Sequence, residues 1–416
     1  MRDVGTLFSP LDNELELAGH EQLTPWLQAC LVRLGTNEAF GRAVKEMAFH
    51  HQVTVSKESV RAHTEAAGEV YVQLQLQAVA QDSTPAAPAA PAAPALSIAP
   101  GCDRHMLCVD AAKVLTTTGE WRDVKTLTLA EVLPDGETRQ NSYFSRMSDY
   151  RLFAQQAQVE VMRRQLKHSR AACAVNDGAD WIPAVVTACR PDAVRILDFY
   201  HAAEHLAESG HAAWGPQSPE FQVWFERYRR ELRDGDPDCV LAALSDLAVQ
   251  YPHQAQVINA TQGYLIQRRE NIRYVEFKAA HWPIGSGPGE AAHKVVIQSR
   301  MKGTGMRWHV NNIDRMAAMR NLICNERWDS DWPVIVTARV AARSQPMTSP
   351  AAPTVVPLVS SSSTSSSTSS STSSSTSSST SSSRLPLGFK LRSGIPWRHQ
   401  PVGQARARPS SPLENG

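Results

Sequence analysis

The chain has 416 residues, of which 42% are hydrophobic and 20% are charged, and this length and composition exclude a single small module. At roughly 150 residues per domain, the length allows two or three domains. Lys and Arg number 42 against 41 Asp and Glu, and residues 384–416 hold six basic residues and one acidic residue, so the rest of the chain has a net charge of −4. A general affinity for polyanions is thereby excluded, and any contact with nucleic acid has to come from local basic patches.

The cysteines and the apolar runs indicate the compartment. Seven cysteines are scattered singly along the sequence, with an odd total and no close pair of the zinc-ribbon kind. This pattern is typical of a reducing compartment. No run reaches the ~18 consecutive apolar residues that span a bilayer, and acidic residues near the amino terminus stand where a signal peptide has its apolar core. We therefore expect a soluble cytoplasmic protein, associated with the nucleoid, with no membrane partner.

Residues 1–81 predict a small helical N-terminal domain. The spacing of apolar residues predicts three helices, over residues 25–34, 43–50 and 57–68. The last two have the form of a helix-turn-helix, with a short helix, a polar turn and a second helix. Lys57 and Arg61 on the second helix are candidates for DNA contact; the alternative is that they line the solvated side of an ordinary helical hairpin.

Two changes in composition mark domain boundaries. Residues 82–100 are a Pro-Ala run that predicts an extended, semi-rigid linker. From residue 341 the chain is rich in Pro, Ser and Thr, and residues 360–383 are almost pure SSST repeat, followed by a basic end. Because such a segment is too polar to offset the entropy of ordering, we expect residues 341–416 to be disordered.

Residues 101–340 predict an α/β catalytic domain. Short apolar or β-branched runs predict strands over residues 105–110, 121–133, 171–178 and 193–199. Helical patterns at 148–167 and 181–189 separate these strands, and residues 219–273 are helical throughout, which predicts an all-α insertion at about 207–280. Strands that alternate with helices form α/β sheets, whose active sites lie at the carboxyl ends of the strands.

Three acids occupy positions that favour catalysis. Asp110 ends the first predicted strand, Asp177 ends a later one, and Glu290 directly follows the glycine-rich turn GSGPGE. If the three converge, they can hold two Mg²⁺ or Mn²⁺ ions, which suit attack at phosphorus. Two carboxylates ~4 Å apart repel by about 4 kcal/mol at an effective dielectric of 20, and a divalent ion reverses this cost. The alternatives are an ordinary Asp-Gly turn at Asp177, or Asp180 as the second ligand.

The segment around Glu290 is locally basic. Residues 284–328 hold seven basic and three acidic residues, and four of the basic ones are candidates for DNA contact: Lys294, Arg300, Lys302 and Arg307. Lys294 lies one helical turn beyond Glu290, so it could contact a phosphate beside the metals. The alternative is an i,i+4 ion pair with Glu290, worth only about 0.3–0.5 kcal/mol.

The sequence DFYHAAEHL (198–206) can be interpreted in two chemistries. His201, Glu204 and His205 match the H-x-x-E-H pattern of zinc hydrolases, with Glu276 as an available third ligand. In the other interpretation Asp198 and His201 form a D-x-x-H pair at the end of a strand, beside the metal site. His205 also fits a hydrogen-bonded histidine on a helix.

Six motifs carry a resemblance to a known family. In chain order they are VDAAKV (109–114), NDGADWI (176–182), ILDFYHAAEHL (196–206), IGSGPGEAAHK (284–294), RMKGTGMRW (300–308) and MRNLICNERW (319–328). Together they resemble the bacterial insertion-sequence transposases of the ISKra type, relatives of the eukaryotic Mutator-like transposases, over about residues 8–332. The resemblance implies a ribonuclease H-like fold with an Asp-Asp-Glu triad and a D-x-x-H motif before a helical insertion. By position, Asp110, Asp177 and Glu290 take the triad roles, and Asp198 and His201 take the D-x-x-H.

The resemblance implies a DNA transposase. Such an enzyme cuts double-stranded DNA at the terminal inverted repeats of its element and joins the freed 3′-OH to target DNA, with Mg²⁺ or Mn²⁺ as the cofactor and at least a homodimer in the DNA complex. Two alternatives stay open at this point. One is an inactive transposase remnant that only binds DNA, and the other is a zinc-dependent hydrolase built on residues 201–205.

Overall fold

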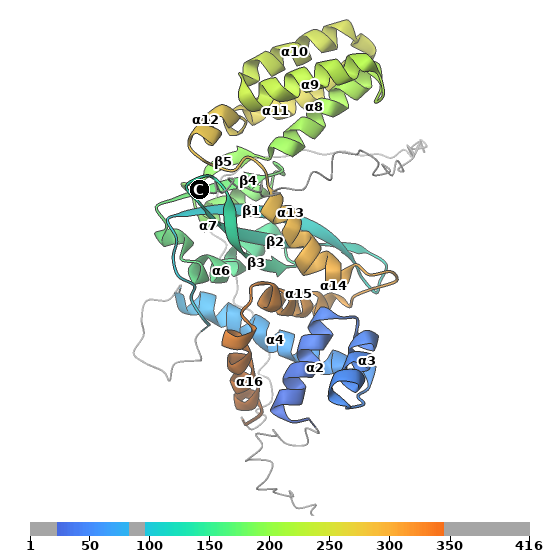
Figure 1. Cartoon of the computed structure of the whole chain (residues 1–416), viewed down its shortest axis with the longest axis vertical. Helices are drawn as coiled ribbons and strands as arrows, with labels where there is room; N and C mark the ends of the chain where they lie inside the picture. Colours follow the sequence, from blue (N-terminus) through green and yellow to red (C-terminus); the bar gives the residue numbers. More distant parts are fainter. Residues whose placement is uncertain (1–22, 83–95, 345–416) are drawn as a thin grey trace, which may run out of the picture. The chain divides into compact units, whose positions relative to one another are not determined.

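The computed structural model describes residues 23–82 and 96–344, which belong to one structural unit (Figure 1). Most of the predicted Pro-Ala linker (83–95) and the predicted tail from residue 345 lie outside the described residues. The described end of the linker is docked, because Ala99 donates its backbone N–H to the carbonyl of Arg163 at 2.8 Å. Residues 341–344, predicted to begin the tail, instead continue a helix.

A five-stranded mixed sheet forms the centre of the unit, which confirms the predicted α/β class. Its order is β3-β2-β1-β4-β5. Strands β1, β2 and β3 pair antiparallel, whereas β4 and β5 run parallel to β1. The bounds are Arg104–Leu115 for β1, Trp121–Val132 for β2, Thr138–Arg146 for β3, Ala171–Asn176 for β4 and Val194–Leu197 for β5. The sequence did not predict β3, whose first residues are polar and exposed.

Both faces of the sheet are covered, because successive side chains of a strand point to opposite faces. On β1, Leu107 and Val109 join the core that is covered by helices α5, α6 and α7, whereas Met106 and Cys108 join the core under the helical insertion. The bounds of the covering helices are Tyr150–Gln156 for α5, Gln158–Arg163 for α6 and Ile182–Cys189 for α7. Asp110 lies an even number of residues after Met106, and the register of β1 has no bulge between them. The side chain of Asp110 therefore points to the same face of the sheet as Met106, the face that the insertion covers.

The predicted all-α insertion is present between β5 and the glycine-rich turn (Figure 1). It consists of α8 (Phe199–Trp214), α9 (Pro219–Asp234), α10 (Pro237–Gln250), α11 (Ala255–Gln267) and α12 (Tyr274–Ala279), with short 3-10 turns at Pro252–Gln254 and Arg269–Asn271. Another 3-10 turn, Leu166–His168, lies outside the insertion, before β4. Helix α8 begins at Phe199, earlier than predicted, because the Asp198 side chain accepts hydrogen bonds from the first free N–H groups.

The N-terminal helices share a core with the last helices of the unit. They are α2 (Pro25–Asn37), α3 (Phe40–His51) and α4 (Lys57–Asp82), and they pack with α15 (Val310–Cys324) and α16 (Trp328–Ser344). Leu31, Met47, Tyr71, Leu322 and Ile335 are all buried in this one core. Residues 23–82 are therefore not a separate domain, contrary to the prediction, and α4 continues well beyond its predicted end at residue 68.

A buried ion pair joins three parts of this core. The guanidinium of Arg163 on α6 donates to both carboxylate oxygens of Asp331 on α16, at 2.7 and 3.0 Å, and the hydroxyl of Tyr71 on α4 donates to the same carboxylate at 2.7 Å. The two charged side chains are only 3% and 0% exposed. Ser97 accepts a further hydrogen bond from Arg163, so the segment after the linker is held at the same point.

Gly68→Ala tests the close packing of α4 on α15. A Cβ at Gly68 would lie 2.5 Å from the carbonyl oxygen of Arg315, which is backbone and cannot swing aside. We expect the substitution to lower the free energy of unfolding by about 1–3 kcal/mol, measured by urea denaturation. The control is Gly263→Ala on α11, where nothing lies within 4 Å; it should raise the free energy of unfolding by about 0.5–1 kcal/mol. Equal effects of the two substitutions would contradict this packing.

Candidate active site

Asp110 and Asp177 lie at the same edge of the sheet. Parallel pairing of β1 with β4 ends at Leu107 and Ala174. Beyond this point the side chain of Asn176 bridges the strands, since its Oδ1 accepts the backbone N–H of Val109 at 2.6 Å. Asp177 directly follows β4, and Asp110 is the next residue of β1 after the bridge, so the two acids stand together where parallel strands place active sites.

The third acid, Glu290, is brought to this edge by α13 (Gly287–Ala292), which packs against β1 and β2. The approach is close, because a Cβ at Gly289 would lie 2.9 Å from the Cβ of Cys108 on β1. Only a residue without a side chain fits there. Glu290 is the next residue along the helix, and it is exposed.

The electrostatics of Asp110 indicate that the three acids are near one another. Burial raises the pKa of Asp110, and the negative charges of Asp177 and Glu290 act in the same direction, against His293 and the backbone N–H of Ala111. The side chain is still 44% exposed, so it is accessible. Three carboxylates of different chain segments that repel one another at a sheet edge form the kind of site that a divalent cation stabilises.

The described residues contain no group of three or more His, Cys, Asp or Glu side chains already arranged to hold a metal ion. This finding applies to the three acids and to the histidines of α8 alike. The donor set of the three acids, carboxylate oxygens alone, fits Mg²⁺ or Mn²⁺ rather than Zn²⁺.

Asp198 is a buried acid whose two carboxylate oxygens both accept hydrogen bonds within the fold. Its side chain is 3% exposed, and its Oδ1 accepts the backbone N–H groups of Tyr200 and His201 at 2.7 and 3.3 Å. Its Oδ2 accepts the N–H of Ser286 at 2.8 Å and also the Ser286 hydroxyl. The structure therefore gives Asp198 a structural role, since it caps α8 and fixes the glycine-rich turn that carries Glu290; its catalytic role stays a prediction.

His201 does not form a side-chain pair with Asp198. Its Nδ1 lies 3.7 Å from the carboxylate of Glu204, and its ring stacks edge-on against His205 with 4.9 Å between centroids. Glu276, the third ligand that a zinc site would need, lies 3.5 Å from the guanidinium of Arg273. The H-x-x-E-H interpretation therefore gains no support from the geometry.

The sequence did not single out His293, which lies beside Asp110. It begins a π-helical segment (His293–Gln298) that follows α13 and leads into α14 (Ser299–Met301). Its Nδ1 lies 3.7 Å from Oδ2 of Asp110, and its buried Nε2 has no hydrogen-bond partner among the described residues. Burial lowers the pKa of His293, although the Asp110 carboxylate acts to raise it. His293 follows Glu290 by three residues, so the two side chains share one face of a helix. This spacing is the signal in the sequence that could have identified His293.

Two further residues that the sequence did not indicate hold the turn of Asp177. Tyr264 on α11 and Arg268 at the C-cap of this helix both donate hydrogen bonds to backbone carbonyls of this turn, at 2.6 and 2.7 Å. Nothing in the local sequence marks these two residues, since they contact a turn that lies far away along the chain.

Arg300 does not face solvent, which corrects its predicted contact with DNA. Its side chain is 2% exposed and donates two hydrogen bonds to the carbonyl of Gly35, at 3.2 and 3.0 Å. Its guanidinium also lies 4.6 Å from the ring centroid of Phe40 and 5.0 Å from that of Trp308. Burial lowers its pKa to about 10. Arg300 therefore joins α2 and α3 to the segment after Glu290.

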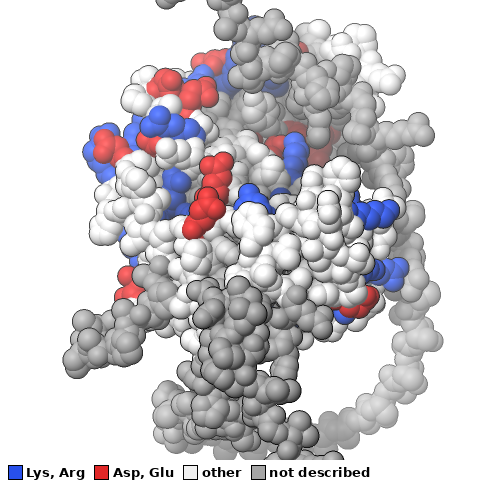
Figure 2. Space-filling model, turned by 60° about the horizontal axis from the view of Figure 1, so that its bottom comes forward, with Lys and Arg blue, Asp and Glu red and all other residues white. Residues whose placement is uncertain are grey.

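The other candidate DNA contacts are exposed: Lys57, Arg61, Lys294, Lys302 and Arg307. Burial raises the pKa of Glu65 on α4, and the charges of Arg61, Arg315 and His309 act against this shift. On the face drawn in Figure 2, positive and negative side chains are interspersed rather than gathered into one field. The basic character is therefore local.

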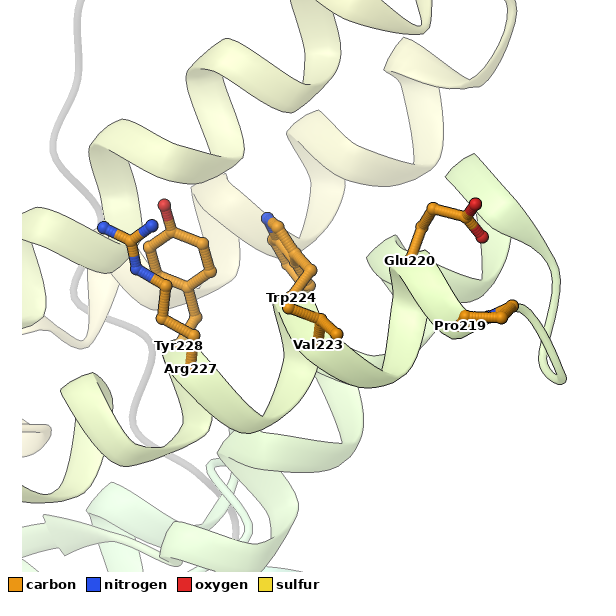
Figure 3. A pocket seen from close by; sticks show the side chains of 6 residues that line it. All are labelled: Pro219, Glu220, Val223, Trp224, Arg227 and Tyr228. Carbon is orange, nitrogen blue, oxygen red and sulfur yellow. The ribbon is translucent and has the colours of Figure 1, made fainter.

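A shallow pocket of about 440 Å³ lies along helix α9 (Figure 3). All the side chains that line it come from this helix: Pro219, Glu220, Val223, Trp224, Arg227 and Tyr228. The pocket is therefore separate from the edge of the sheet that carries the acids.

None of the described helices is both long enough and apolar enough to span a bilayer. Comparison with models of protein families finds no match to this sequence, and comparison with curated proteins finds none either.

Proposed function

We propose that the protein is a DNA transposase that cleaves phosphodiesters at the ends of its element and joins the freed 3′-OH to target DNA. The observation that carries the proposal is that three carboxylates from distant chain segments are brought toward one edge of the sheet. Asp110 lies within β1 directly after Val109, Asp177 follows the parallel strand β4, and Glu290 lies on α13, which packs against β1 and β2. The charges of Asp177 and Glu290 act to raise the pKa of Asp110, after the larger effect of burial. Three such acids match the triad that the family resemblance implies.

The strand arrangement supports a ribonuclease H-like core within this proposal. Three consecutive antiparallel strands are followed by two parallel strands that add to the other side of β1. The helical insertion enters after β5, before the segment that carries the third acid. This order of sheet, insertion and final acid agrees with the order of motifs in the resemblance.

The residues of the chain have separable roles in the proposed reaction. Asp110, Asp177 and Glu290 would hold Mg²⁺ or Mn²⁺, which when bound lowers the pKa of water and stabilises negative charge at phosphorus. Asp198 holds the turn of Glu290 through Ser286. His293 lies against Asp110 and restricts the position of its carboxylate.

The basic track, which we define as the exposed Lys302 and Arg307 that follow Glu290 along the chain, would contact the phosphates of duplex DNA. Phosphate contacts of this kind give binding that does not depend on sequence. Joining at two element ends requires at least two copies of the chain in the DNA complex.

The direct test is a nicking assay on a duplex that carries an element end. The DNA that flanks the reading frame is searched for inverted repeats bounded by short direct duplications. A duplex that contains one such repeat is labelled at the 5′ end of one strand. Full-length protein should nick this duplex at the repeat boundary when Mg²⁺ or Mn²⁺ is present. It should not nick the duplex when EDTA removes the metal. Binding without cleavage in either metal would favour the inactive remnant, and cleavage that needs Zn²⁺ would favour the hydrolase.

Lys302→Ala combined with Arg307→Ala tests the basic track. We expect weaker binding to specific and unrelated duplexes alike, with the slope of log K against log salt reduced by about 2 because two phosphate contacts are lost. Fluorescence anisotropy at several salt concentrations measures both quantities. Arg227→Ala combined with Arg230→Ala removes two exposed charges from α9 and is the control. An equal loss of slope in the control would contradict a track at Lys302 and Arg307.

A further inference from the structure

The turn that carries Asp177 has a special backbone conformation. Oδ1 of Asp177 accepts the N–H of Ala179 at 3.0 Å, which closes a tight turn within the chain. Gly178 has a φ of +83°, in the left-handed region that favours glycine. A turn of this kind has few contacts of its own, so the position of the Asp177 carboxylate depends on what packs against it.

Helix α11 of the insertion supplies those contacts. The hydroxyl of Tyr264 donates to the carbonyl of Asp177 at 2.6 Å, and the guanidinium of Arg268 donates to the carbonyl of Gly178 at 2.7 Å. Arg268 lies four residues after Tyr264, at the C-cap of α11, so both side chains project from the same side of this end of the helix. Two consecutive carbonyls of the turn are thus held by adjacent side chains of one element.

The two side chains also fix each other. The Arg268 guanidinium lies 4.0 Å from the centroid of the Tyr264 ring, a distance at which a cation over an aromatic face is attracted. Its side chain is only 15% exposed, and it lies 3.4 Å from the carboxylate of Asp180. Ordered donors of this kind hold their acceptors more firmly than mobile surface side chains do.

The turn and the end of α11 are in direct contact. A Cβ at Gly178 would lie 2.6 Å from the hydroxyl oxygen of Tyr264 and 2.7 Å from Nε of Arg268. A shift of α11 must therefore move the turn with it.

We infer that Tyr264 and Arg268 are positioning residues, through which the helical insertion sets the geometry of Asp177 in the cation site. The inference rests on the proposed function as far as the cation is concerned. Groups that orient a metal ligand by hydrogen bonding typically change metal affinity by about 10–100-fold when they are removed. The insertion is thereby part of the site, although it contributes no ligand.

The test measures Mn²⁺ binding to the full-length protein without DNA, by the electron paramagnetic resonance signal of free Mn²⁺. Arg268→Ala should weaken binding by about 10–100-fold, and Tyr264→Phe, which removes one oxygen, by a smaller factor. Arg269→Ala is the matched control one residue away, because Arg269 pairs with Asp238 on the surface. Tyr228→Phe, on the α9 pocket, is the control for the loss of a hydroxyl. Both controls should bind Mn²⁺ as the parent does.

Amide hydrogen exchange at Gly178 and Ala179 gives a second readout that needs neither metal nor activity. Exchange there should be faster in Tyr264→Phe and Arg268→Ala than in the parent, at an unchanged melting temperature. Unchanged exchange and unchanged Mn²⁺ binding in both variants would overturn the inference. If the parent binds no Mn²⁺, the proposed metal site fails, and the exchange rates alone then decide whether α11 positions the turn. If Arg268→Ala lowers the melting temperature, the inference is judged on the exchange rates and Mn²⁺ binding of Tyr264→Phe alone.

Discussion

Asp110→Asn, Asp177→Asn and Glu290→Gln should each reduce metal-dependent cleavage of an element-end duplex by about a thousandfold or more, which is ~4 kcal/mol of lost transition-state stabilisation. Each substitution keeps the size of the side chain and removes one negative charge from a group of three that affect one another. A neutral amide is a much weaker ligand for a hard divalent cation. Single-turnover nicking rates measure the effect.

The companion measurement is DNA binding, which should change little or become tighter, because removing a carboxylate reduces repulsion of phosphate. Asp180→Asn is the control, since Asp180 follows the same turn and is fully exposed; it should cleave within a few-fold of the parent. Cleavage retained in Asp177→Asn and lost in Asp180→Asn would reassign the second ligand. Cleavage retained in all three amide variants would refute the proposed chemistry.

Asp331→Ala should lower the free energy of unfolding by about 3–5 kcal/mol, because it leaves the charge of Arg163 buried without a partner. Arg163 is 3% exposed, and two of its hydrogen bonds end on Asp331. The variant also removes the acceptor of the Tyr71 hydroxyl. Urea denaturation followed by tryptophan fluorescence measures the change.

Two comparisons sharpen this result. Asp123→Ala breaks the exposed pair of Asp123 with Lys113 and should cost at most about 1 kcal/mol. Arg163→Met combined with Asp331→Leu removes both buried charges and should recover much of the loss. A loss in Asp331→Ala no larger than that in Asp123→Ala would contradict the buried pair.

The ion pair of Arg163 and Asp331 also makes the free energy of unfolding depend on pH. Burial acts to raise the pKa of Asp331, but hydrogen bonds from Arg163 and Tyr71 together with the charge of Arg163 outweigh it and lower the pKa. A lowered pKa in the folded state means that the carboxylate stabilises the protein fully above its ordinary pKa of about 3.9. This stabilisation is lost as the pH falls through the lower folded-state value.

The sequence predicted those parts of the fold that have a strong local pattern. Strands β1, β4 and β5 are short apolar runs, and the insertion has continuous helical periodicity with Pro and Ser or Asp at the helix starts. Strand β3 was missed because its first half is polar and because its second half is buried by contacts with elements far away in the sequence, such as α15. Helix α4 was ended too early because Gly68 resembles a helix terminator, whereas it permits the contact with Arg315.

The sequence identified the three candidate acids of the site, but it did not identify the residues that hold these acids in place. Asp177 directly follows β4 and Glu290 lies in the first turn of α13, and both positions are visible in the sequence. Asp110 does not end its strand as predicted, because β1 continues to Leu115 through its pairing with β2. Asp198 looked catalytic because it ends a strand, but all its acceptors are used within the fold. The burial of Arg300 depends on the carbonyl of Gly35 and on rings far away in the chain, and no local pattern encodes such contacts.

The core that joins α2, α3 and α4 to α15 and α16 has a consequence for synthesis on the ribosome. The first three helices leave the exit tunnel long before their partners are translated, so apolar side chains such as Leu31 and Met47 are without their final cover while the sheet and insertion are made. Cotranslational folding of this part is therefore delayed until nearly all of the described chain has emerged. Nascent chains arrested before Ile335 should accordingly need chaperones more than released protein does.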